Sequence, residues 1–418
     1  MLRIVGLVLA GGGGKDLSVL TAERAVGAVP YGGKYRVVDF VLSNCAHSEI
    51  SQIGVLTQHV PASLHDHIGA GRAWGFDHRG GGVQILQPYL TRSDAEWYRG
   101  TAHAIARNWD RVEALGASRV LVVSGDQVYR MDYRRMLAVH ERRGATVTLA
   151  VTRVPSSEAH RFGMVQFDSD GRVTKLEEKP RRTEATHASM GVYLFEAAAL
   201  GELLRDRPAD LVLDVIEPML KAGEAVHVHE FAGYWEDVGT VASYYRSNLD
   251  LVEATPRLEL LNPRWPVLSR DEERPPVHVG AAADIGESLV ANGCRVDGRV
   301  RRSVLFPGAV VERGAEVVES IVFPEACVAA GARVDRAILD KHVLVGAGAV
   351  VGHGPAPRAP GLAWLDGLVL VGKDAQVPEG MRIGRGVVVG INADFSGCGA
   401  AIAAGGSLPS RLWYEGLV

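Results

Sequence analysis

Four consecutive glycines, residues 11–14, follow an apolar run that begins at Ile4. Glycine has no side chain, so the backbone of such a loop can approach a ligand and point several N–H groups at it. Phosphate groups are the usual ligands of such a loop at the end of a strand. The pattern therefore predicts a buried strand that leads into a phosphate-binding loop. A tight turn without a ligand is the alternative, because one glycine loop is a weak signal.

Two aspartates could provide a metal site beside this loop. Asp126 follows an apolar run and Gly125, and Asp237 lies in the sequence Tyr-Trp-Glu-Asp-Val-Gly-Thr of residues 234–240. Mg²⁺ prefers a few carboxylates together with phosphate oxygens and water, so the pair predicts a Mg²⁺–nucleotide site. The alternatives are an Asx turn at Asp126 and a loop acid near a buried tryptophan at Asp237.

A sheet must hold these residues. Short apolar runs predict strands, and the alternation of polar and apolar residues over 97–115 predicts a helix. The predicted strands after the first are residues 53–58, 120–124, 146–154, 164–167 and 192–195. Strands alternating with helices indicate an α/β domain with a Rossmann-like, mostly parallel sheet covered on both faces. Since ligands bind at the carboxyl ends of such strands, we expect the glycine loop and Asp126 to open into one crevice.

An internal repeat occupies the second half of the chain. The segment from Ser303 matches those from Ser320 and Ala337, each 17 positions after the one before. The repeated positions are Gly314, Gly331 and Gly348, and the apolar sets Leu305/Val322/Leu339, Val311/Val328/Val345 and Val317/Val334/Val351. Apolar residues about six positions apart predict one short strand per face and three faces per coil. Because single coils are unstable and stack their valines on one another, the repeat predicts a parallel β-helix.

Length and composition bound the domain organisation. With 418 residues the chain is too long for one ordinary core, and 47% hydrophobic with 22% charged residues is typical of a globular protein. A stretch rich in proline and charge indicates a linker. We predict a first domain over 1–250, the linker over 251–276, the β-helix over 277–400 and a tail over 401–418.

Charge and cysteine usage exclude several classes of protein. The formal net charge of −4 argues against nucleic-acid binding. No apolar run approaches the length of a membrane span and no signal peptide is apparent, so we expect a cytoplasmic protein without membrane association. The cysteines form no CxxC pair and predict reduced thiols rather than disulfides or a zinc site. They are Cys45, Cys294, Cys327 and Cys398.

Short motifs follow one another over the first 250 residues. They are Leu-Ala-Gly-Gly at 9–12, Tyr-Gly-Gly-Lys at 31–34, Arg-Val-Val-Asp-Phe at 36–40, Leu-Ser-Asn-Cys at 42–45, Trp-Tyr-Arg-Gly-Thr-Ala at 97–102, Ser-Gly-Asp-Gln-Val-Tyr at 124–129, Phe-Gly at 162–163, Glu-Lys-Pro at 178–180, Ser-Met-Gly-Val-Tyr at 189–193 and Trp-Glu-Asp-Val-Gly-Thr at 235–240. In this order they resemble the sugar-nucleotide pyrophosphorylases, and within them the glucose-1-phosphate adenylyltransferase (ADP-glucose pyrophosphorylase) family.

The resemblance implies an enzyme that converts ATP and glucose 1-phosphate to ADP-glucose and pyrophosphate for glycogen or α-glucan synthesis. It implies that Asp126 and Asp237 hold Mg²⁺. It assigns sugar-phosphate binding to Tyr98, Gly163, Glu178, Lys179 and Ser189, and nucleotide binding to Ala10, Gly11, Gly12 and Gln58. The attacking phosphate oxygen is already anionic, so alignment and charge neutralisation suffice without a general base.

The resemblance also has implications for the second half. It implies a left-handed β-helix that mediates tetramer formation, as a homotetramer or with a paralogous subunit. Arg24 and Arg36 match positions near an effector site, although either could be ordinary surface charge. An acyltransferase is a further alternative suggested by a β-helix alone, but His342 lies in a turn-like position where a solvated histidine is the ordinary interpretation.

The glycine loop departs from the family pattern. Gly13 and Asp16 stand where arginines are expected, Lys15 replaces a threonine, and Val26 replaces a lysine. Losing one preorganised donor to a developing charge costs roughly 2.7–4 kcal/mol, about a hundred- to a thousandfold in rate. Either Lys15 reaches the phosphates and takes a catalytic role, or the chain is a catalytically impaired regulatory subunit beside an active paralogue.

Overall fold

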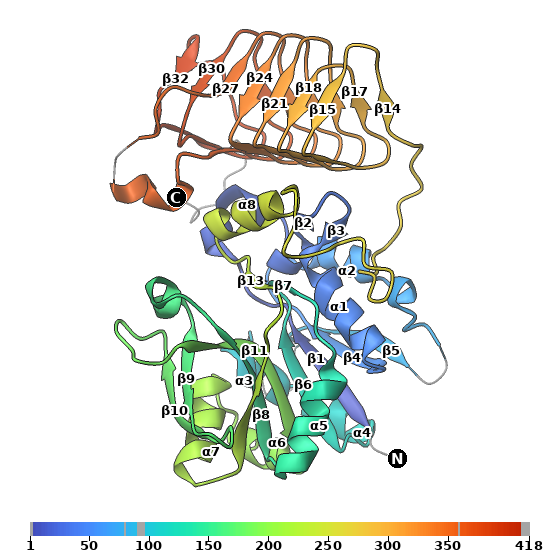
Figure 1. The fold of residues 1–418 in the computed structure, drawn as a ribbon, viewed down its shortest axis with the longest axis vertical. Helices are drawn as coiled ribbons and strands as arrows, with labels where there is room; N and C mark the ends of the chain where they lie inside the picture. The colour runs from blue at the N-terminus through green and yellow to red at the C-terminus, as the bar shows by residue number, and fades with distance from the viewer. Residues whose placement is uncertain (1–2, 79–80, 90–96, 358–359, 411–418) are drawn as a thin grey trace. The chain divides into compact units, whose positions relative to one another are not determined.

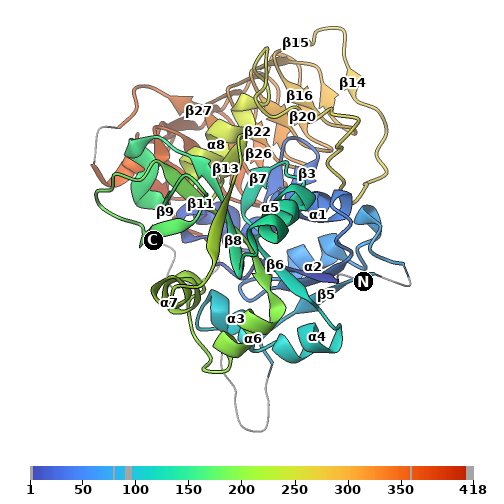
Figure 2. The ribbon, with the colours of Figure 1, turned by 60° about the horizontal axis from the view of Figure 1, so that its bottom comes forward.

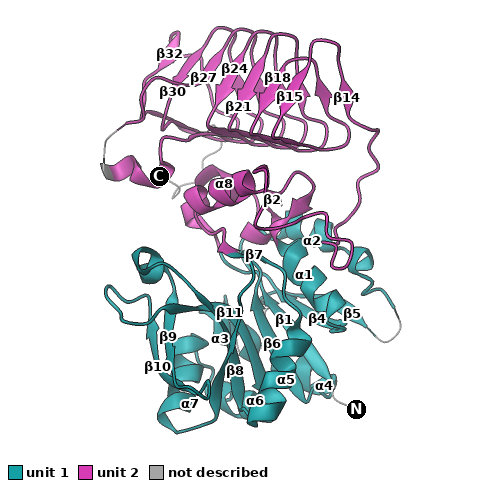
Figure 3. Cartoon of the chain, viewed as in Figure 1, with its two compact units in different colours: residues 1–12, 38–235 teal, residues 13–37, 236–418 magenta. Residues whose placement is uncertain are grey.

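The chain divides into two compact units (Figure 3). The computed structural model describes residues 3–78, 81–89, 97–357 and 360–410. Unit 1 consists of Met1–Gly12 and Val38–Trp235, and unit 2 consists of Gly13–Val37 and Glu236–Val418. The chain therefore passes from one unit to the other inside the glycine loop. The domain boundaries expected at 250, 276 and 400 stay predictions, and the tail expected over 401–418 extends beyond the described residues.

Unit 1 is built on a nine-stranded sheet (Figure 1). Its strands are β1 (Ile4–Leu9), β4 (Gln52–Leu56), β5 (Gly82–Leu86), β6 (Arg119–Ser124), β8 (Val147–Arg153), β9 (Gly163–Phe167), β10 (Val173–Glu178), β11 (His187–Glu196) and β12 (Val226–Glu230). The order is β10-β9-β11-β6-β1-β4-β5, and β8 pairs with β11 and β12. The six strands predicted from sequence are confirmed as β1, β4, β6, β8, β9 and β11. The apolar runs do not predict β5, β10 and β12, because polar residues interrupt all three strands.

Parallel pairing aligns the strands that lead into the predicted site. β1 pairs in parallel with β4 and β6, and β4 pairs in parallel with β5. β11 runs antiparallel to β6, β8 and β9. The α/β class is therefore confirmed. The parallel part of the sheet brings the carboxyl ends of β1, β4 and β6 to one edge.

Helices cover both faces of the sheet (Figure 2). They are α1 (Val37–His47), α2 (Ala62–Ile68), α3 (Thr101–Ala106), α4 (Trp109–Ala114), α5 (Tyr133–Arg143), α6 (Ala197–Leu204) and α7 (Glu217–Lys221). His140 of α5 contacts Thr148 of β8 at 2.8 Å, whereas the adjacent Val147 and Leu149 join the core that α3 and α6 complete. Since successive strand residues face opposite ways, α5 covers one face and α3 with α6 the other. The helix expected over 97–115 is in fact two, because Asn108 leaves the helical conformation between α3 and α4.

The second half of unit 2 is a left-handed parallel β-helix of three sheets. The first sheet is β14 (His278–Val279), β17 (Arg295–Val296), β20 (Val310–Val311), β23 (Cys327–Val328), β26 (Leu344–Val345) and β29 (Gln376–Val377). The second sheet is β15 (Asp284–Gly286), β18 (Arg299–Arg301), β21 (Glu316–Val318), β24 (Arg333–Asp335), β27 (Val350–His353), β30 (Arg382–Gly384) and β32 (Ala401–Ile402). The third sheet is β16 (Leu289–Val290), β19 (Val304–Leu305), β22 (Ile321–Val322), β25 (Ala337–Leu339), β28 (Val369–Val371), β31 (Val388–Val389) and β33 (Ser407–Leu408).

The 17-residue repeat is one coil of this β-helix. All three predicted apolar sets are confirmed as stacks of paired residues in adjacent coils. The glycines of the repeat occupy corners with left-handed backbone, with φ of 73° at Gly314, 68° at Gly331 and 64° at Gly348. His342 also lies at a left-handed corner, with φ of 59°, and its side chain is exposed. The repeat therefore reflects both the buried stacks and the corners.

The rest of unit 2 contains short elements from both ends of the predicted first domain. They are the 3₁₀-helices η1 (Lys15–Thr21) and η2 (Val26–Ala28), the strands β2 (Pro30–Tyr31) and β3 (Tyr35–Arg36), and the helix α8 (Val241–Asp250). The strand β13 (Trp235–Asp237) begins with the last residue of unit 1 and continues into unit 2. α8 packs on residues 30–32: the Tyr31 hydroxyl donates to the Ser247 carbonyl at 3.0 Å, and the Gly32 N–H donates to Asn248 at 2.9 Å. Residues 13–37 thus fold with α8 and the β-helix, although they follow β1 in the chain.

The expectations about cysteine thiols and about membrane spans can be compared with the described residues. All four cysteines are free thiols, and Cys45 and Cys294 are buried. No helix in the described part of the chain is long and apolar enough to cross a membrane.

Replacing Gly331 by alanine tests the importance of the left-handed corners. No atom lies within 4 Å of a Cβ at this position, so the cost comes from the backbone conformation alone. We expect Gly331→Ala to destabilise the β-helix by about 1–2 kcal/mol, and Gly331→Asn by less, because asparagine tolerates this conformation. Denaturant unfolding measures both differences. Equal stability of the alanine variant and the parent protein would contradict a left-handed corner at residue 331.

Candidate functional site

The candidate site in unit 1 begins at the carboxyl ends of β1, β4 and β6. The N–H of Ala10 donates to the Leu56 carbonyl at 2.9 Å, and the N–H of Gly125 donates to the Leu9 carbonyl at the same distance. Ala10 is buried, with 7% of its surface exposed. These two bonds continue the sheet by one residue and hold the start of the glycine loop against the turn that carries Asp126.

Predicted nucleotide-binding residues and Tyr98 come together here. A Cβ built on Gly11 would lie 3.4 Å from the Cβ of Gln58, so the loop passes directly over this side chain. Gln58 accepts from the Tyr98 N–H at 2.7 Å and donates to the Tyr98 carbonyl at 3.4 Å. The Tyr98 hydroxyl accepts from Asn108 at 2.9 Å, and burial raises the pKa of this tyrosine. Gly12 is exposed, with open space around its Cβ position.

A polar cluster beside Gln58 was not predicted from the sequence. Thr57 lies 3.0 Å from His65 Nε2, and the Gln87 amide lies 3.3 Å from the same ring. Burial lowers the pKa of His65. Thr57 and Gln87 each follow the last residue of a strand, β4 and β5. The strand predicted over residues 53–58 already contained Thr57, and no apolar run marked β5, so neither residue was signalled as a polar group at a strand end.

The predicted sugar-binding residues form a second group. Gly163 and Glu178 are paired across β9 and β10, and a Cβ at 163 would lie 2.9 Å from Glu178 Oε2. Ser189 lies beside Gly163 and donates to the Tyr193 hydroxyl at 3.1 Å. Although the Glu178 side chain as a whole is exposed, desolvation of its carboxylate raises its pKa, and the Lys179 charge opposes this rise. The absence of a side chain at 163 therefore leaves room for this carboxylate.

Lys179 is held beside the other predicted sugar-binding residues by an unusual backbone conformation. Its φ is 44°, in the left-handed region, and its N–H donates to the Phe162 carbonyl at 3.1 Å. The Phe162 ring packs edge-on against Trp235, with ring centroids 5.1 Å apart, and the Trp235 indole donates to Gln127 at 3.1 Å. Trp235 and Gln127 are thus supporting residues that the motifs contain without indicating their role.

Asp126 is connected to the predicted sugar-binding residues by short contacts. Its carboxylate is half-buried and accepts from the Ser124 hydroxyl at 2.5 Å. A Cβ on Gly191 would lie 3.2 Å from Ser124 Cβ, and the Gly191 N–H donates to Ser189 at 3.4 Å. Unit 1 therefore brings Asp126 and Ser189 into one set of contacts between the carboxyl end of β6 and the first half of β11.

Asp237 belongs to unit 2, so its joint binding of a metal with Asp126 stays a prediction. It is half-buried, and its Oδ1 accepts from the Gly239 N–H at 2.8 Å. Among the described residues no three His, Cys, Asp or Glu side chains gather as a metal site. Two carboxylates nevertheless suit Mg²⁺, which commonly uses one or two protein carboxylates and completes its shell with water and phosphate.

Lys15 opens η1 in unit 2 and its side chain is exposed. Gly14 before it has φ of 58°, and a Cβ there would lie 2.4 Å from Val26 Cγ2. Val26 is buried, so the residue that replaces the expected lysine packs under the loop. Asp16 is exposed.

The two arginines predicted near an effector site differ in their surroundings. Arg24 is buried and forms a two-point ion pair with the fully buried Asp340, at 2.9 and 3.0 Å. Arg36 is half-buried on β3. Burial, together with the charges of Arg36 and Arg24, lowers the pKa of Lys341 to about 8. Unit 2 thus brings Arg24, Arg36 and Lys341 into one cationic cluster around Asp340.

Comparison with known proteins gives matches to both halves of the chain. Residues 5–254 match the nucleotidyl transferase family, and residues 277–360 match the GlmU-like C-terminal hexapeptide family. The chain is 41% identical over 396 residues to a glucose-1-phosphate adenylyltransferase of Acetivibrio thermocellus, covering 93% of each chain. It is 40% identical over 324 residues to a glucose-1-phosphate adenylyltransferase of Clostridioides difficile, covering 76% of this chain and 84% of that one.

The neighbouring residues Glu177 and Glu178 should affect stability with opposite signs. The raised pKa of Glu178 means that its ionised form costs stability at high pH and that the cost disappears on acidification below its unfolded pKa. We therefore expect Glu178→Gln to raise the melting temperature at pH 8 and to lose this advantage near pH 4. A melting temperature at pH 8 below that of the parent protein would contradict the desolvation of Glu178.

Glu177→Gln is the matched control. Hydrogen bonds from Lys175 and Thr183 lower the pKa of Glu177, so this carboxylate stabilises the fold at neutral pH and loses that effect as pH falls through its lowered pKa. The control variant should melt earlier than the parent protein at pH 8, and the difference should shrink in acid.

Proposed function

Because the chain belongs to the glucose-1-phosphate adenylyltransferase family, we propose that it transfers the adenylyl group of ATP to glucose 1-phosphate, forming ADP-glucose and pyrophosphate. The observation that carries this proposal is the meeting of distant motifs in unit 1. Gly11, Gln58 and Tyr98 form one group, and Gly163, Glu178 and Ser189 form another. The contacts of Ser124 and Gly191 join Asp126 to the second group.

The chemistry requires positioning more than proton transfer. A phosphate oxygen of glucose 1-phosphate attacks the α-phosphorus of ATP, and the bond to pyrophosphate breaks. Glu178 would accept hydrogen bonds from sugar hydroxyls, which requires its ionised form, and Lys179 would bind the sugar phosphate as a point charge. Asp126 and Asp237 would hold Mg²⁺, which when bound neutralises phosphate charge and orients the reacting groups.

The glycine loop would contribute backbone donors and one cation. The N–H groups of Gly11 and Gly12 would meet the phosphates of ATP, and Lys15 would supply the positive charge that the family loop takes from arginines. Turnover on this proposal depends on Lys15. If the loop no longer supports catalysis, the chain is instead a regulatory subunit that retains its ligands.

The first test is pyrophosphate release by the purified chain with Mg²⁺, glucose 1-phosphate and each nucleoside triphosphate. We expect ATP-dependent turnover that falls about a hundred- to a thousandfold in Asp126→Asn and in Lys15→Ala, because each variant removes a charge aimed at the phosphates. If Lys15→Ala turned over at the same rate as the parent protein, this lysine would not replace the missing arginines. No turnover by the parent chain, with ATP still bound and activity restored by Gly13→Arg with Asp16→Arg, would establish the regulatory alternative.

We also propose that the chain is cytoplasmic and forms a tetramer through the β-helix, either from identical chains or with a paralogous subunit. We further propose that an anionic effector binds at the cationic cluster of unit 2. Arg36 and Lys341 are better candidates than Arg24 for direct effector contact, since Arg24 is buried against Asp340. An anion at this cluster would favour the charged form of Lys341.

The lowered pKa of Lys341 predicts a pH-dependent effector site. Sulfate is a suitable probe because its charge is constant between pH 6.5 and 9. The lysine is charged below about pH 8 and neutral above it, so calorimetric sulfate affinity should fall as pH rises through 8. Lys341→Arg should remove this dependence, because arginine stays protonated. An affinity that does not change with pH in the parent protein would contradict a role for Lys341.

A further inference from the structure

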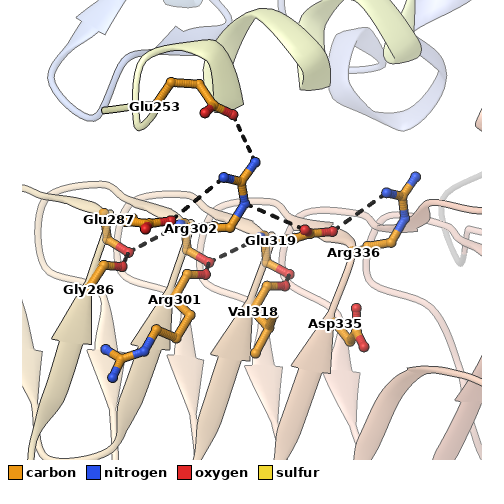
Figure 4. Close-up of polar contacts among 12 residues, drawn as sticks. Glu253, Gly286, Glu287, Arg301, Arg302, Val318, Glu319, Asp335 and Arg336 are labelled. Atoms are coloured by element: carbon orange, nitrogen blue, oxygen red, sulfur yellow. Dashed lines mark hydrogen bonds and ion pairs between the residues drawn. The ribbon is translucent and has the colours of Figure 1, made fainter. Parts of the chain in front are cut away.

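A row of charged residues lines one edge of the β-helix (Figure 4). The corner ladder consists of Glu287, Arg302, Glu319 and Arg336, each at the corner between the second and third sheets of successive coils. All four have left-handed backbone, with φ between 42° and 50°. Charges alternate along the ladder, and Arg302 lies 3.6 Å from both Glu287 and Glu319. Arg336 lies 3.6 Å from Glu319 and completes the series.

The corner ladder also holds α8 and the segment that follows it. Arg302 donates to Glu253, three residues beyond the end of α8, at 2.9 Å, and this bond raises the pKa of Arg302. The Tyr245 hydroxyl on α8 donates to the Glu319 carbonyl at 2.6 Å, and the Arg336 guanidinium lies over the Tyr245 ring, 5.7 Å from its centroid. Tyr245 is only 7% exposed. Three successive coils, at Arg302, Glu319 and Arg336, therefore fix α8 from its middle to beyond its end.

The other end of α8 leads directly to Asp237. Thr240 caps the helix through a reciprocal pair of bonds with Ser243, and Asp237 accepts from the Gly239 N–H just before this cap. Arg246, next to Tyr245 on the helix, reaches back to Glu236 at 3.5 Å. The loop of residues 236–240 is thus tied to the first turns of α8 by its cap and by an ion pair.

We propose that the corner ladder positions Asp237 through α8, which makes Tyr245, Arg302 and Arg336 positioning residues for the metal-binding carboxylate. This inference rests on the proposed function, in which Asp237 holds Mg²⁺. A capped helix fixed to stacked coils gives the loop before it little freedom, so Asp237 is ordered before the metal arrives. Loosening α8 adds an ordering cost to metal binding. Tyr245, Arg302 and Arg336 are not themselves among the proposed sugar-binding residues of unit 1.

The test compares Glu253→Gln and Tyr245→Phe with the matched control Glu287→Gln. Glu253 and Glu287 are both exposed acids paired with Arg302, but Glu253 belongs to the α8 segment whereas Glu287 belongs to the β-helix. Hydrogen–deuterium exchange of residues 236–240 in metal-free protein should rise in the two test variants and stay at the parent rate in the control. The Mg²⁺ concentration at half-maximal rate should rise about two- to fivefold in Glu253→Gln and about two- to tenfold in Tyr245→Phe, with KM for glucose 1-phosphate unchanged.

The outcomes separate the inference from the proposed function. The inference would be overturned if residues 236–240 exchanged at the parent rate in both test variants, or if Glu287→Gln accelerated their exchange as much as the test variants do. The proposed function would remain standing in either case. Faster exchange with an unchanged Mg²⁺ concentration at half-maximal rate would also overturn it, provided that Asp237→Asn raises this concentration or abolishes turnover. An unchanged Mg²⁺ dependence in Asp237→Asn would overturn the metal role of Asp237 itself, and the inference with it.

Discussion

The candidate site in unit 1 depends on the parallel register of β1 with β4 and β6. Leu9 is paired with Leu56 on one side and with Ser124 on the other, so the three strands end at the same level. Consecutive residues of all three strands are buried, so a slip of one residue would exchange side chains between the two covered faces and disrupt the packing on both. The residues that follow, in the glycine loop, at Gln58 and at Asp126, are consequently brought to one edge. The register of an apolar sheet thus sets the geometry of polar groups that contribute little to its stability.

Features that depend on burial or on local backbone conformation could be predicted from the sequence. The three apolar sets of the repeat stack as expected, because a valine in each coil must cover the valine below it. The glycines of the repeat were equally informative, because a left-handed corner favours a residue without Cβ. The same corner conformation is also adopted by Glu319 and Arg336, however. Their charges pair between coils, and no local pattern signals that a charged residue is at a strained corner.

Contacts between distant segments could not be predicted. Arg24 pairs with Asp340, 316 residues away, and Tyr245 bonds to Glu319, 74 residues away. Each residue has an ordinary surface interpretation when taken alone, and its burial follows only from how residues 13–37 and α8 pack on the β-helix. For the candidate site, the motifs indicated which residues matter. They did not indicate supports such as Trp235 and Gln127, because a supporting role is defined by contacts rather than by residue type.

The altered glycine loop shows how substitutions can change a site through packing as well as through charge. Val26 is buried against Gly14, and the nearby Arg24 is committed to a buried ion pair, where withdrawing one partner would leave an uncompensated charge. Neither side chain can therefore turn toward the loop without a cost in stability. The exposed Lys15 has no such constraint, since it opens η1 directly after the left-handed Gly14. Charge that is missing at residues 13, 16 and 26 can be supplied at this solvent-facing position without disturbing the core of unit 2. The packing around the glycine loop thus favours a relocated cation at Lys15 as the explanation for the departure from the family pattern.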